Sequence, residues 1–157
     1  MAAGGRERFL ARAEELGLEV EHRRFPDGTR TAVQAADAVG CEVDQIVKSL
    51  VFVADGEPVL ALTSGAHRVD TGRLATALGA ESVRKADADE VRGATGYAIG
   101  GTPPVGHTRP LRTLLDPRLL DFEEVWAAAG TPMDVFPLAP TRLRELADAE
   151  VVDVTEG

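Results

Sequence analysis

The sequence has very little cysteine: Cys41 is the only one in 157 residues, which excludes an internal disulfide and suits a reducing compartment. Long hydrophobic runs are missing too, because no apolar stretch approaches the roughly 20 residues of a membrane helix. The N-terminal residues lack the apolar core of a signal peptide. We therefore expect a cytoplasmic protein without membrane segments. No internal repeat, low-complexity tract or long linker is present, so residues 1–157 are expected to form a single domain.

Positive charge is also scarce. The formal net charge is −9, which argues against unspecific binding of duplex nucleic acid through a broad basic surface. Residues 1–85 hold 11 basic and 13 acidic residues (−2), whereas residues 86–157 hold 6 and 13 (−7). A smaller basic patch can therefore form on the N-terminal half, although a solvated surface of mixed charge stays open for each arginine. The candidates are Arg6, Arg12, Arg23, Arg24, Arg30 and Arg68.

The signatures of several catalytic classes are absent. His22, His67 and His107 lie far apart in the sequence, and no His-Glu-x-x-His or paired-cysteine spacing is present, so we predict no metal site. There is no Gly-x-Ser-x-Gly elbow for a serine nucleophile, no Walker A loop and no dinucleotide fingerprint, so we predict no cofactor. The chemistry that remains is one in which substrate positioning and electrostatics suffice.

Lys48 is the most informative residue that is present. It interrupts the apolar run Ile46–Val53, whose β-branched and aromatic residues predict a strand. Alternation along a strand places Lys48 on the same face as Leu50 and Phe52. An ammonium on such a face must be paired, reach water along its stem or act on a ligand. An isolated lysine of this kind more often reaches solvent, and a second unusual segment is what favours a functional role here.

That second segment is a glycine- and proline-rich loop over residues 96–107, flanked by apolar residues. Glycine lets the backbone approach a ligand closely, and functional residues concentrate on loops. Because Lys48 and the loop are far apart in the sequence, only the fold can bring them together. We predict one cleft, with the Lys48 ammonium at its mouth and the Gly100 and Gly101 amides on its wall.

Short strands are expected to alternate with helices without a regular βαβ rhythm, which favours an α+β fold with a mixed sheet. Several short strands in a small chain further favour a curled, barrel-like sheet with surrounding helices. Asp55-Gly56 between two apolar runs predicts a tight hairpin. The expected strands cover residues 20–25, 46–53, 58–63, 97–99, 111–115, 125–128, 135–138 and 151–154. The expected helices cover residues 5–16, 31–39, 70–79, 87–92 and 141–146, with caps at Thr31, Asp70 or Thr71, Asp87 and Thr141.

Several segments stand in an order that carries a family resemblance. They are Thr31–Gly40, Gln45–Phe52, Gly65–Asp70, Thr95–Tyr97, a Gly-x-x-x-Pro pattern at Gly100–Pro104, and Met133–Leu138 around Asp134. In this order they resemble the YbaK and prolyl-tRNA synthetase-associated family of aminoacyl-tRNA editing domains, over residues 23–153. Lys48 matches the family's near-universal lysine. The amino-acid specificity stays open, because residues 102–107 and 127–133 depart from the cysteine-specific branch.

The resemblance implies a mixed β-barrel packed with helices and, in trans, hydrolysis of the ester bond of mischarged tRNA. The substrate would be tRNA for proline, or another tRNA that carries a small wrong amino acid, and association with a synthetase is implied as well. Lys48, Gly100 and Gly101 would be catalytic. Candidate contacts to the 3′ aminoacyl end are Ser49, Tyr97, Thr102, Pro104, His107 and Asp134.

Other interpretations stay open beside these. Tyr97 suits the core equally well, Asp134 suits a surface strand, and His107 can be a loop residue without a function. The whole chain can also be a non-catalytic RNA- or ligand-binding relative of the editing domain. A third interpretation is a hydrolase that acts on a small ester or another aminoacyl conjugate without tRNA.

Overall fold

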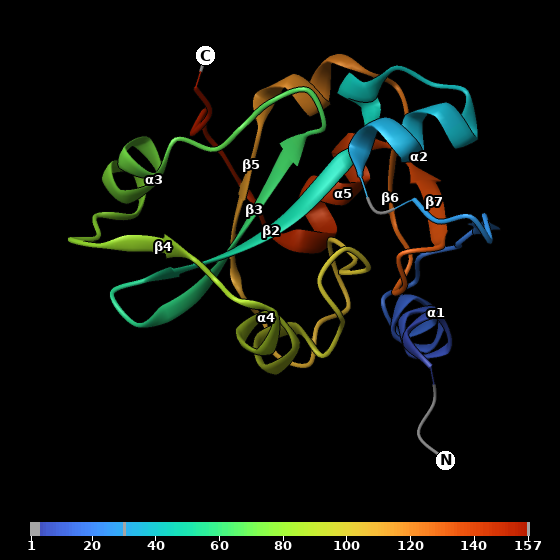
Figure 1. Cartoon of the computed structure of the whole chain (residues 1–157), viewed down its shortest axis with the longest axis horizontal. Helices are drawn as coiled ribbons and strands as arrows, with labels where there is room; N and C mark the ends of the chain where they lie inside the picture. Colours follow the sequence, from blue (N-terminus) through green and yellow to red (C-terminus); the bar gives the residue numbers. More distant parts are fainter. Residues whose placement is uncertain (1–3, 30, 157) are drawn as a thin grey trace.

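A computed structural model of the chain describes residues 4–29 and 31–156 (Figure 1). The strands are β1 (Arg23–Arg24), β2 (Val47–Ala54), β3 (Glu57–Ser64), β4 (Val83–Lys85), β5 (Arg112–Leu115), β6 (Val125–Ala128), β7 (Asp134–Leu138) and β8 (Glu150–Val151). They form a five-stranded sheet of order β4-β2-β3-β5-β8 and a three-stranded sheet of order β1-β7-β6. The larger sheet has antiparallel and parallel neighbours, so the predicted mixed α+β fold is confirmed.

The larger sheet is built on the hairpin of β2 and β3, which pair antiparallel along their whole length. Asp55 and Gly56 turn the chain with φ of 48° and 85°. Glycine adopts such left-handed values without strain and aspartate tolerates them, which is why this dipeptide predicts a hairpin correctly. β4 pairs with the end of β2; it is short and charged, and it is absent from the expected strands.

The two sheets do not close into the expected barrel. Their pairing, within the described residues, is limited to one parallel bridge between Ile46 and Trp126. On the larger sheet, β4 covers the outer edge of β2 only at Phe52–Ala54. The outer edge of β2 is therefore unpaired between these two points, and a pocket lies in the gap where a closed barrel would have continued the ladder.

Capping residues set the helix boundaries at most predicted positions. Thr31 starts α2 with a capping box, and Gly40 ends it with a φ of 79°. Asp70 caps α3, and Asp87 caps α4 with a second capping box. None of the helices in the described residues is long and apolar enough to cross a membrane. The helices are α1 (Gly5–Glu15), α2 (Ala32–Val39), α3 (Thr71–Leu78), α4 (Ala88–Thr95) and α5 (Pro140–Ala147), with 3₁₀ turns at Val43–Gln45 and Pro117–Asp121.

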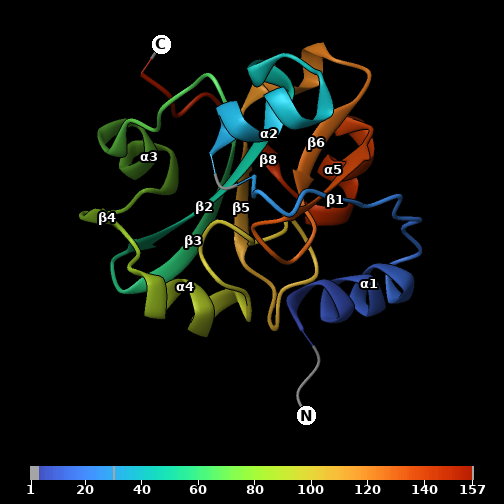
Figure 2. The same cartoon turned by 45° about the vertical axis from the view of Figure 1, so that its right-hand side comes forward.

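The larger sheet is buried on both faces, with α3 and α4 on opposite sides of the β2–β3 hairpin (Figures 1 and 2). Leu74 of α3 belongs to the same apolar cluster as Phe52. Val91 of α4 belongs to the cluster of Val51. Because neighbouring side chains on a strand point to opposite faces, Lys48 falls on the α3 face with Phe52.

Three strand predictions need correction. Residues 97–99 do not form a strand, because Gly96 ends α4 in the left-handed conformation (φ 87°) and the chain enters a loop. The strands expected at residues 20–25 and 151–154 are much shorter, at Arg23–Arg24 and Glu150–Val151. Apolar composition alone does not show how far a partner strand extends, so the ends of edge strands are poorly predicted.

Two helix predictions also differ from the structure. The helix expected to stop before Gly93 continues to Thr95, with Gly93 inside α4. The last helix begins at Pro140 and not at Thr141, with Ala139 in the cap position. Proline suits the first helical residue because its φ is already helical and the N–H it lacks would have no partner there.

Candidate active site

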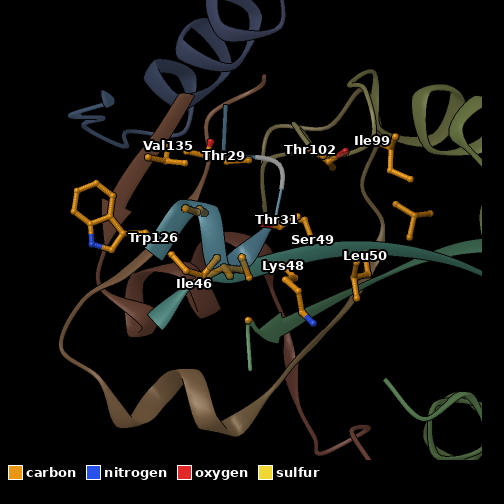
Figure 3. Close-up of a pocket in the computed structure, with 18 of the residues that line it drawn as sticks. Thr29, Thr31, Ile46, Lys48, Ser49, Leu50, Ile99, Thr102, Trp126 and Val135 are labelled. Carbon is orange, nitrogen blue, oxygen red and sulfur yellow. The ribbon is translucent and has the colours of Figure 1, made fainter. Parts of the chain in front are cut away.

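The pocket of about 450 Å³ lies over the unpaired outer edge of β2. The segment entering α2 and the smaller sheet bound it on one side, and α4 with the glycine-rich loop bounds it on the other. Figure 3 shows β2 crossing the pocket below Thr29, Thr102 and Ile99. The lining residues are Thr29, Thr31, Ala32, Val33, Ala35, Ile46 to Val51, Gly65, Lys85, Ala86, Val91, Ile99, Gly100, Thr102, Trp126, Ala127, Ala128 and Val135.

Ser49 presents its peptide groups to the pocket. The Val51 C=O accepts a hydrogen bond from the Ala86 N–H at 3.1 Å on the outer edge, whereas the Ile46 C=O accepts from the Gly65 N–H at 2.7 Å on the β3 side. Peptide groups alternate between the two edges of an antiparallel strand, so Ser49 points the same way as Val51. The Ser49 Oγ is buried and has no hydrogen-bond partner among the described residues. This residue therefore offers a donor and two acceptors to a ligand.

Lys48 brings the positive charge. Its ammonium donates a hydrogen bond to the backbone C=O of His67. Burial lowers the pKa of the Lys48 amine from its ordinary value, and the nearby Arg68 and Lys85 cations lower it further. Lys48 lines the pocket, but Figure 3 shows its ammonium on the side of β2 away from Thr102 and Ile99. The ammonium is therefore not at the mouth of the cleft, where the sequence predicts it. Partial burial leaves less water around it than around a surface lysine, so its charge is less screened.

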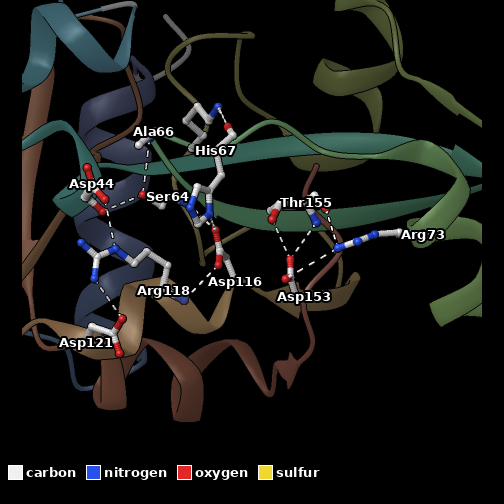
Figure 4. A network of polar contacts seen from close by, with 11 residues as sticks. Asp44, Ser64, Ala66, His67, Arg73, Asp116, Arg118, Asp121, Asp153 and Thr155 are labelled. Carbon is white, nitrogen blue, oxygen red and sulfur yellow. Dashed lines mark hydrogen bonds and ion pairs between the residues drawn. The ribbon is translucent and has the colours of Figure 1, made fainter. Parts of the chain in front are cut away.

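A buried carboxylate fixes the turn that accepts this hydrogen bond. The His67 Nδ1 lies 2.7 Å from the Asp116 Oδ2, and Asp116 is only 2% exposed. Asp116 also accepts from the N–H groups of Ser64 at 3.1 Å and Arg118 at 2.9 Å. Figure 4 shows His67 and Asp116 pointing toward one another from neighbouring turns. The position of the Lys48 ammonium is thus tied to a side-chain network on the far side of β3.

The glycine-rich loop is held by its own hydrogen bonds. The Gly101 N–H and the Thr102 Oγ1 both donate to the Ala98 C=O, at 3.0 Å and 3.1 Å. The Tyr97 hydroxyl donates to the Gly106 C=O at 3.0 Å and closes the loop from inside. A loop bonded in this way is a rigid wall, because its polar groups are already satisfied before a ligand arrives.

Gly100 and Gly101 have different surroundings in that wall. Gly100 lines the pocket and has a φ of 84°, a value that favours glycine. Gly101 is absent from the lining and packs against the backbone of Thr131, where an added Cβ would lie 2.6 Å from the carbonyl carbon. Its N–H already bonds the Ala98 C=O. The amide of Gly101 is therefore engaged in the loop and does not face the pocket.

The structure brings Lys48, Ser49, Gly100 and Thr102 together in one pocket. Pro104 and His107 instead line a separate cavity of about 420 Å³ behind the loop. The His107 Nε2–H donates to the Pro103 C=O at 2.7 Å, and burial lowers the pKa of its imidazole.

Tyr97 and Asp134 are also outside the pocket lining. Tyr97 lies in the core, where burial raises the pKa of its phenol. Asp134 is fully buried behind the pocket wall, at the start of β7. Two of the substrate contacts that the resemblance implies therefore support the wall from behind.

The candidate basic patch is divided among several ion pairs. Arg6 and Arg24 both approach Asp134, Arg12 pairs with Glu15, and Arg68 lies 4.0 Å from Glu156. Arg23 stacks over the ring of Trp126, with its guanidinium carbon 4.9 Å from the ring centroid. Arg30 lies outside the described residues. Arg23 therefore contacts a side chain that lines the pocket.

Sequence reasoning missed several residues of the site. Two residues that line the pocket, Lys85 and Trp126, are absent from the candidates. Also absent are His67, whose C=O accepts the Lys48 hydrogen bond, and Asp116, which contacts His67. His67 lies in the Gly65–Asp70 segment, so its place in that pattern is the one signal that could have indicated it. Asp116 and His67 are 49 positions apart, and no local rule connects them.

An open strand edge, a partly buried lysine and a glycine-rich loop thus meet in one pocket. The chain belongs to the aminoacyl-tRNA editing domain family, which it matches over residues 26–146. All the pocket-lining residues fall inside this range.

Three relatives illustrate the family. A crystal structure provisionally described as a trans-editing enzyme for prolyl tRNA synthetase is 45% identical, with a TM-score of 0.93 over 100% of both chains. The proline–tRNA ligase of Nitratidesulfovibrio vulgaris (strain DP4) is 34% identical over 119 residues, which cover 76% of this chain but only 20% of that enzyme. The uncharacterized protein YwhH of Bacillus subtilis (strain 168) is 31% identical over 132 residues, or 83% of each chain.

Proposed function

We propose that this protein hydrolyses, in trans, the ester bond of tRNA that carries a small wrong amino acid, with tRNA for proline as its principal substrate. The observation that carries the proposal is the meeting of Lys48, Ser49 and Gly100 in one pocket. The relatives support the choice of tRNA, since several are proline–tRNA ligases, of which this chain matches one segment. Association with that synthetase and a cytoplasmic location follow from the substrate.

Ser49 suits recognition of an α-amino acid. An amino acid carries an N–H donor and a C=O acceptor in the spacing that a strand residue shows to its neighbour. The Ser49 C=O and Oγ can accept from the substrate ammonium, while the Ser49 N–H donates to the ester carbonyl. Lys48 contributes its positive charge next to Ser49. Each group is in place before binding, which reduces the cost of ordering the complex.

Hydrolysis in this pocket requires few groups because an aminoacyl ester is already activated. Water adds to the carbonyl carbon, and negative charge develops on the carbonyl oxygen, where the Ser49 N–H and the Lys48 charge stabilise it. The bond to the ribose oxygen then breaks, and that oxygen takes the proton that the water gives up. The products are the free amino acid and tRNA with a free terminal hydroxyl. The described lining residues include no carboxylate or imidazole, so we assign no general base to the protein.

The pocket also suits small side chains. Small apolar side chains, among them Ala86, Val91 and Ala127, line it together with Gly100. A volume of about 450 Å³ must hold the amino acid together with part of the ribose. We expect alanine and serine esters to be cleaved and bulky ones to be spared. One methylene changes the rate by only roughly 10–200-fold in an apolar pocket, so small residues will overlap.

Deacylation of a panel of charged tRNAs tests the proposal. We expect alanyl- and seryl-tRNA for proline to be hydrolysed faster than prolyl-tRNA, and phenylalanyl- or leucyl-tRNA to be stable. Binding of the charged tRNAs without turnover would favour the non-catalytic relative. Equal hydrolysis of a simple alanine ester and alanyl-tRNA would favour a small-ester hydrolase.

A further inference from the structure

Asp134 is a fully buried carboxylate that lies outside the pocket lining. Its Oδ2 accepts hydrogen bonds from the Arg24 Nη1 at 2.9 Å and from the Thr131 Oγ1 at 2.5 Å. Its Oδ1 has no hydrogen-bond partner among the described residues, and the Arg6 Nη1 lies 3.9 Å away. Burying a carboxylate is costly unless its partners are held in place. A buried carboxylate therefore holds the segments that donate hydrogen bonds to it in one position.

The segment that Asp134 fixes is the turn of residues 130–133 between β6 and β7. The Thr131 Oγ1 donates to Asp134 while it accepts from the Met133 N–H at 3.1 Å. On its other side, the turn is bonded to Thr29, whose N–H and Oγ1 both donate to the Pro132 C=O, at 2.7 Å and 2.9 Å. Thr29 lines the pocket. The carboxylate is thus connected to a pocket wall through two hydrogen-bonded steps.

The same turn supports the glycine-rich loop. A Cβ added at Gly101 would lie 2.6–2.9 Å from backbone atoms of Thr131 and Pro132, so the two backbones are in direct contact. The start of α1 also packs directly against the turn, because a Cβ at Gly5 would lie 2.1 Å from the Gly130 carbonyl oxygen. Gly101 precedes Thr102, which lines the pocket. The turn is therefore held between α1 and the wall that faces the open edge of β2.

We propose that Asp134 is a positioning residue: through Thr131 and Pro132 it sets the distance between the glycine-rich wall and Ser49 on β2. Its effect on catalysis rests on the proposed function, whereas its effect on the wall does not. A carboxylate that served stability alone would change the unfolding midpoint when removed and leave the native position of Gly100–Thr102 unchanged. The two roles therefore differ in a property of the folded protein.

The substitution that isolates this link is Thr131→Val, which removes the hydroxyl and keeps the shape of the side chain. Asp134→Asn is the second variant, since it keeps an acceptor oxygen and removes the charge. The chain offers a matched control in Thr155→Val, because Thr155 Oγ1 donates to Asp153 Oδ1 at 2.6 Å with Arg73 nearby. That cluster lies outside the pocket lining, and Figure 4 shows it apart from the contact between His67 and Asp116.

The first readout is the amide NMR spectrum of the folded protein, together with the fluorescence of Trp126, the single tryptophan of the chain and a pocket residue. We expect Thr131→Val and Asp134→Asn to shift the amide resonances of Gly100, Gly101 and Thr102. We also expect them to increase the quenching of Trp126 fluorescence by a quencher added to the solution. Thr155→Val should leave both unchanged. Unshifted loop resonances in a folded Thr131→Val protein would overturn the proposal. If Asp134→Asn does not fold, Thr131→Val alone decides the question.

The second readout is the hydrolysis of alanyl-tRNA. A wall displaced by about 1 Å can cost up to ~100-fold in rate, so we expect kcat to fall by ~10–100-fold in Thr131→Val while KM changes less. An unchanged kcat in a variant whose loop resonances have shifted would also overturn the positioning role. If the wild-type protein hydrolyses no charged tRNA, the proposed function fails, and the NMR and fluorescence comparison still decides whether Asp134 positions the wall.

Discussion

At the scale of single residues, the site depends on the partial burial of Lys48. The ammonium bonds the His67 carbonyl, and burial lowers the pKa of the amine, with Arg68 and Lys85 adding to that effect. Less hydration strengthens the field of the charge at a bound ester. The same desolvation opposes the charged form, so Lys48 contributes little net stability to the fold.

This account predicts the behaviour of two Lys48 variants. Lys48→Ala should lose most of the deacylation rate while the free energy of unfolding changes by only ~1 kcal/mol, because a costly charge and a modest hydrogen bond leave together. Lys48→Arg should rescue poorly, since the guanidinium is larger and its donors lie in a fixed plane. Arg142→Ala, which removes a cation on α5 outside the pocket lining, is the control. Wild-type turnover in a folded Lys48→Ala protein would refute the role of Lys48.

Residues differ in how well the sequence indicates them. Lys48 is visible because a charged residue interrupts an apolar run, and Gly100 because it lies in a glycine-rich loop. His67 and Asp116 give no such signal, since their contact joins two turns that only the fold brings together. Pro104 and His107 are correctly assigned to the loop, but the side of the loop they face depends on its internal hydrogen bonds.

At the scale of elements, the glycine-rich loop keeps its shape through its own hydrogen bonds and through backbone contact with the turn at Thr131. Caps and the hairpin are predictable because a few adjacent residues determine them, as Thr31 and Asp55-Gly56 show. The loop is not predictable to the same degree. Its apolar residues Tyr97 to Ile99 look like a strand, but the left-handed Gly96 and the bond from Tyr97 to Gly106 direct them into a turn.

Two glycine substitutions separate loop packing from general glycine effects. Gly101→Ala places a methyl group against the backbone of Thr131, so we expect the free energy of unfolding to fall by ~1–3 kcal/mol and deacylation to fall with it. Gly93→Ala has open space around the new Cβ inside α4. It should raise the free energy of unfolding by about 0.5–1 kcal/mol, because alanine favours helix. Denaturant titration of both variants measures this, and equal effects of the same sign would contradict the packing described for Gly101.

The loop also predicts a pH dependence. Burial lowers the pKa of His107 below its ordinary value, which is roughly 6.5 in an unfolded chain. Between the folded pKa and about 6.5, the unfolded state binds more protons than the folded state. The free energy of unfolding therefore rises with pH in that window. Acidification through the window removes the stability that neutral His107 contributes. His107→Gln keeps a donor for the Pro103 carbonyl and should flatten this part of the curve. Parallel wild-type and variant curves from pH 7 to pH 5 would show that His107 is not desolvated.

At the scale of the whole molecule, the pocket exists because the two sheets stay open. Short strands in a small chain favour a barrel, but closure depends on which distant strands pair, and the sequence pattern carries no information on that. Here the smaller sheet shares a core with the larger one, but backbone pairing between them is limited, in the described residues, to the Ile46–Trp126 bridge. The unpaired edge of β2 would be a liability for aggregation on an exposed surface. In this fold it lies under α2 and the glycine-rich loop, where a ligand can complete the ladder.

The central claim is that an aminoacyl ester binds in this pocket, against the open edge of β2. The most direct test is an NMR titration of the isotope-labelled protein with alanyl-adenosine in which an amide replaces the ester, so that no hydrolysis occurs. We predict that the largest shifts fall on the amides of Lys48, Ser49, Gly100 and Thr102 and that they saturate together. Largest shifts in the separate cavity around Pro104 and His107, or no saturable shift at Ser49, would contradict the account.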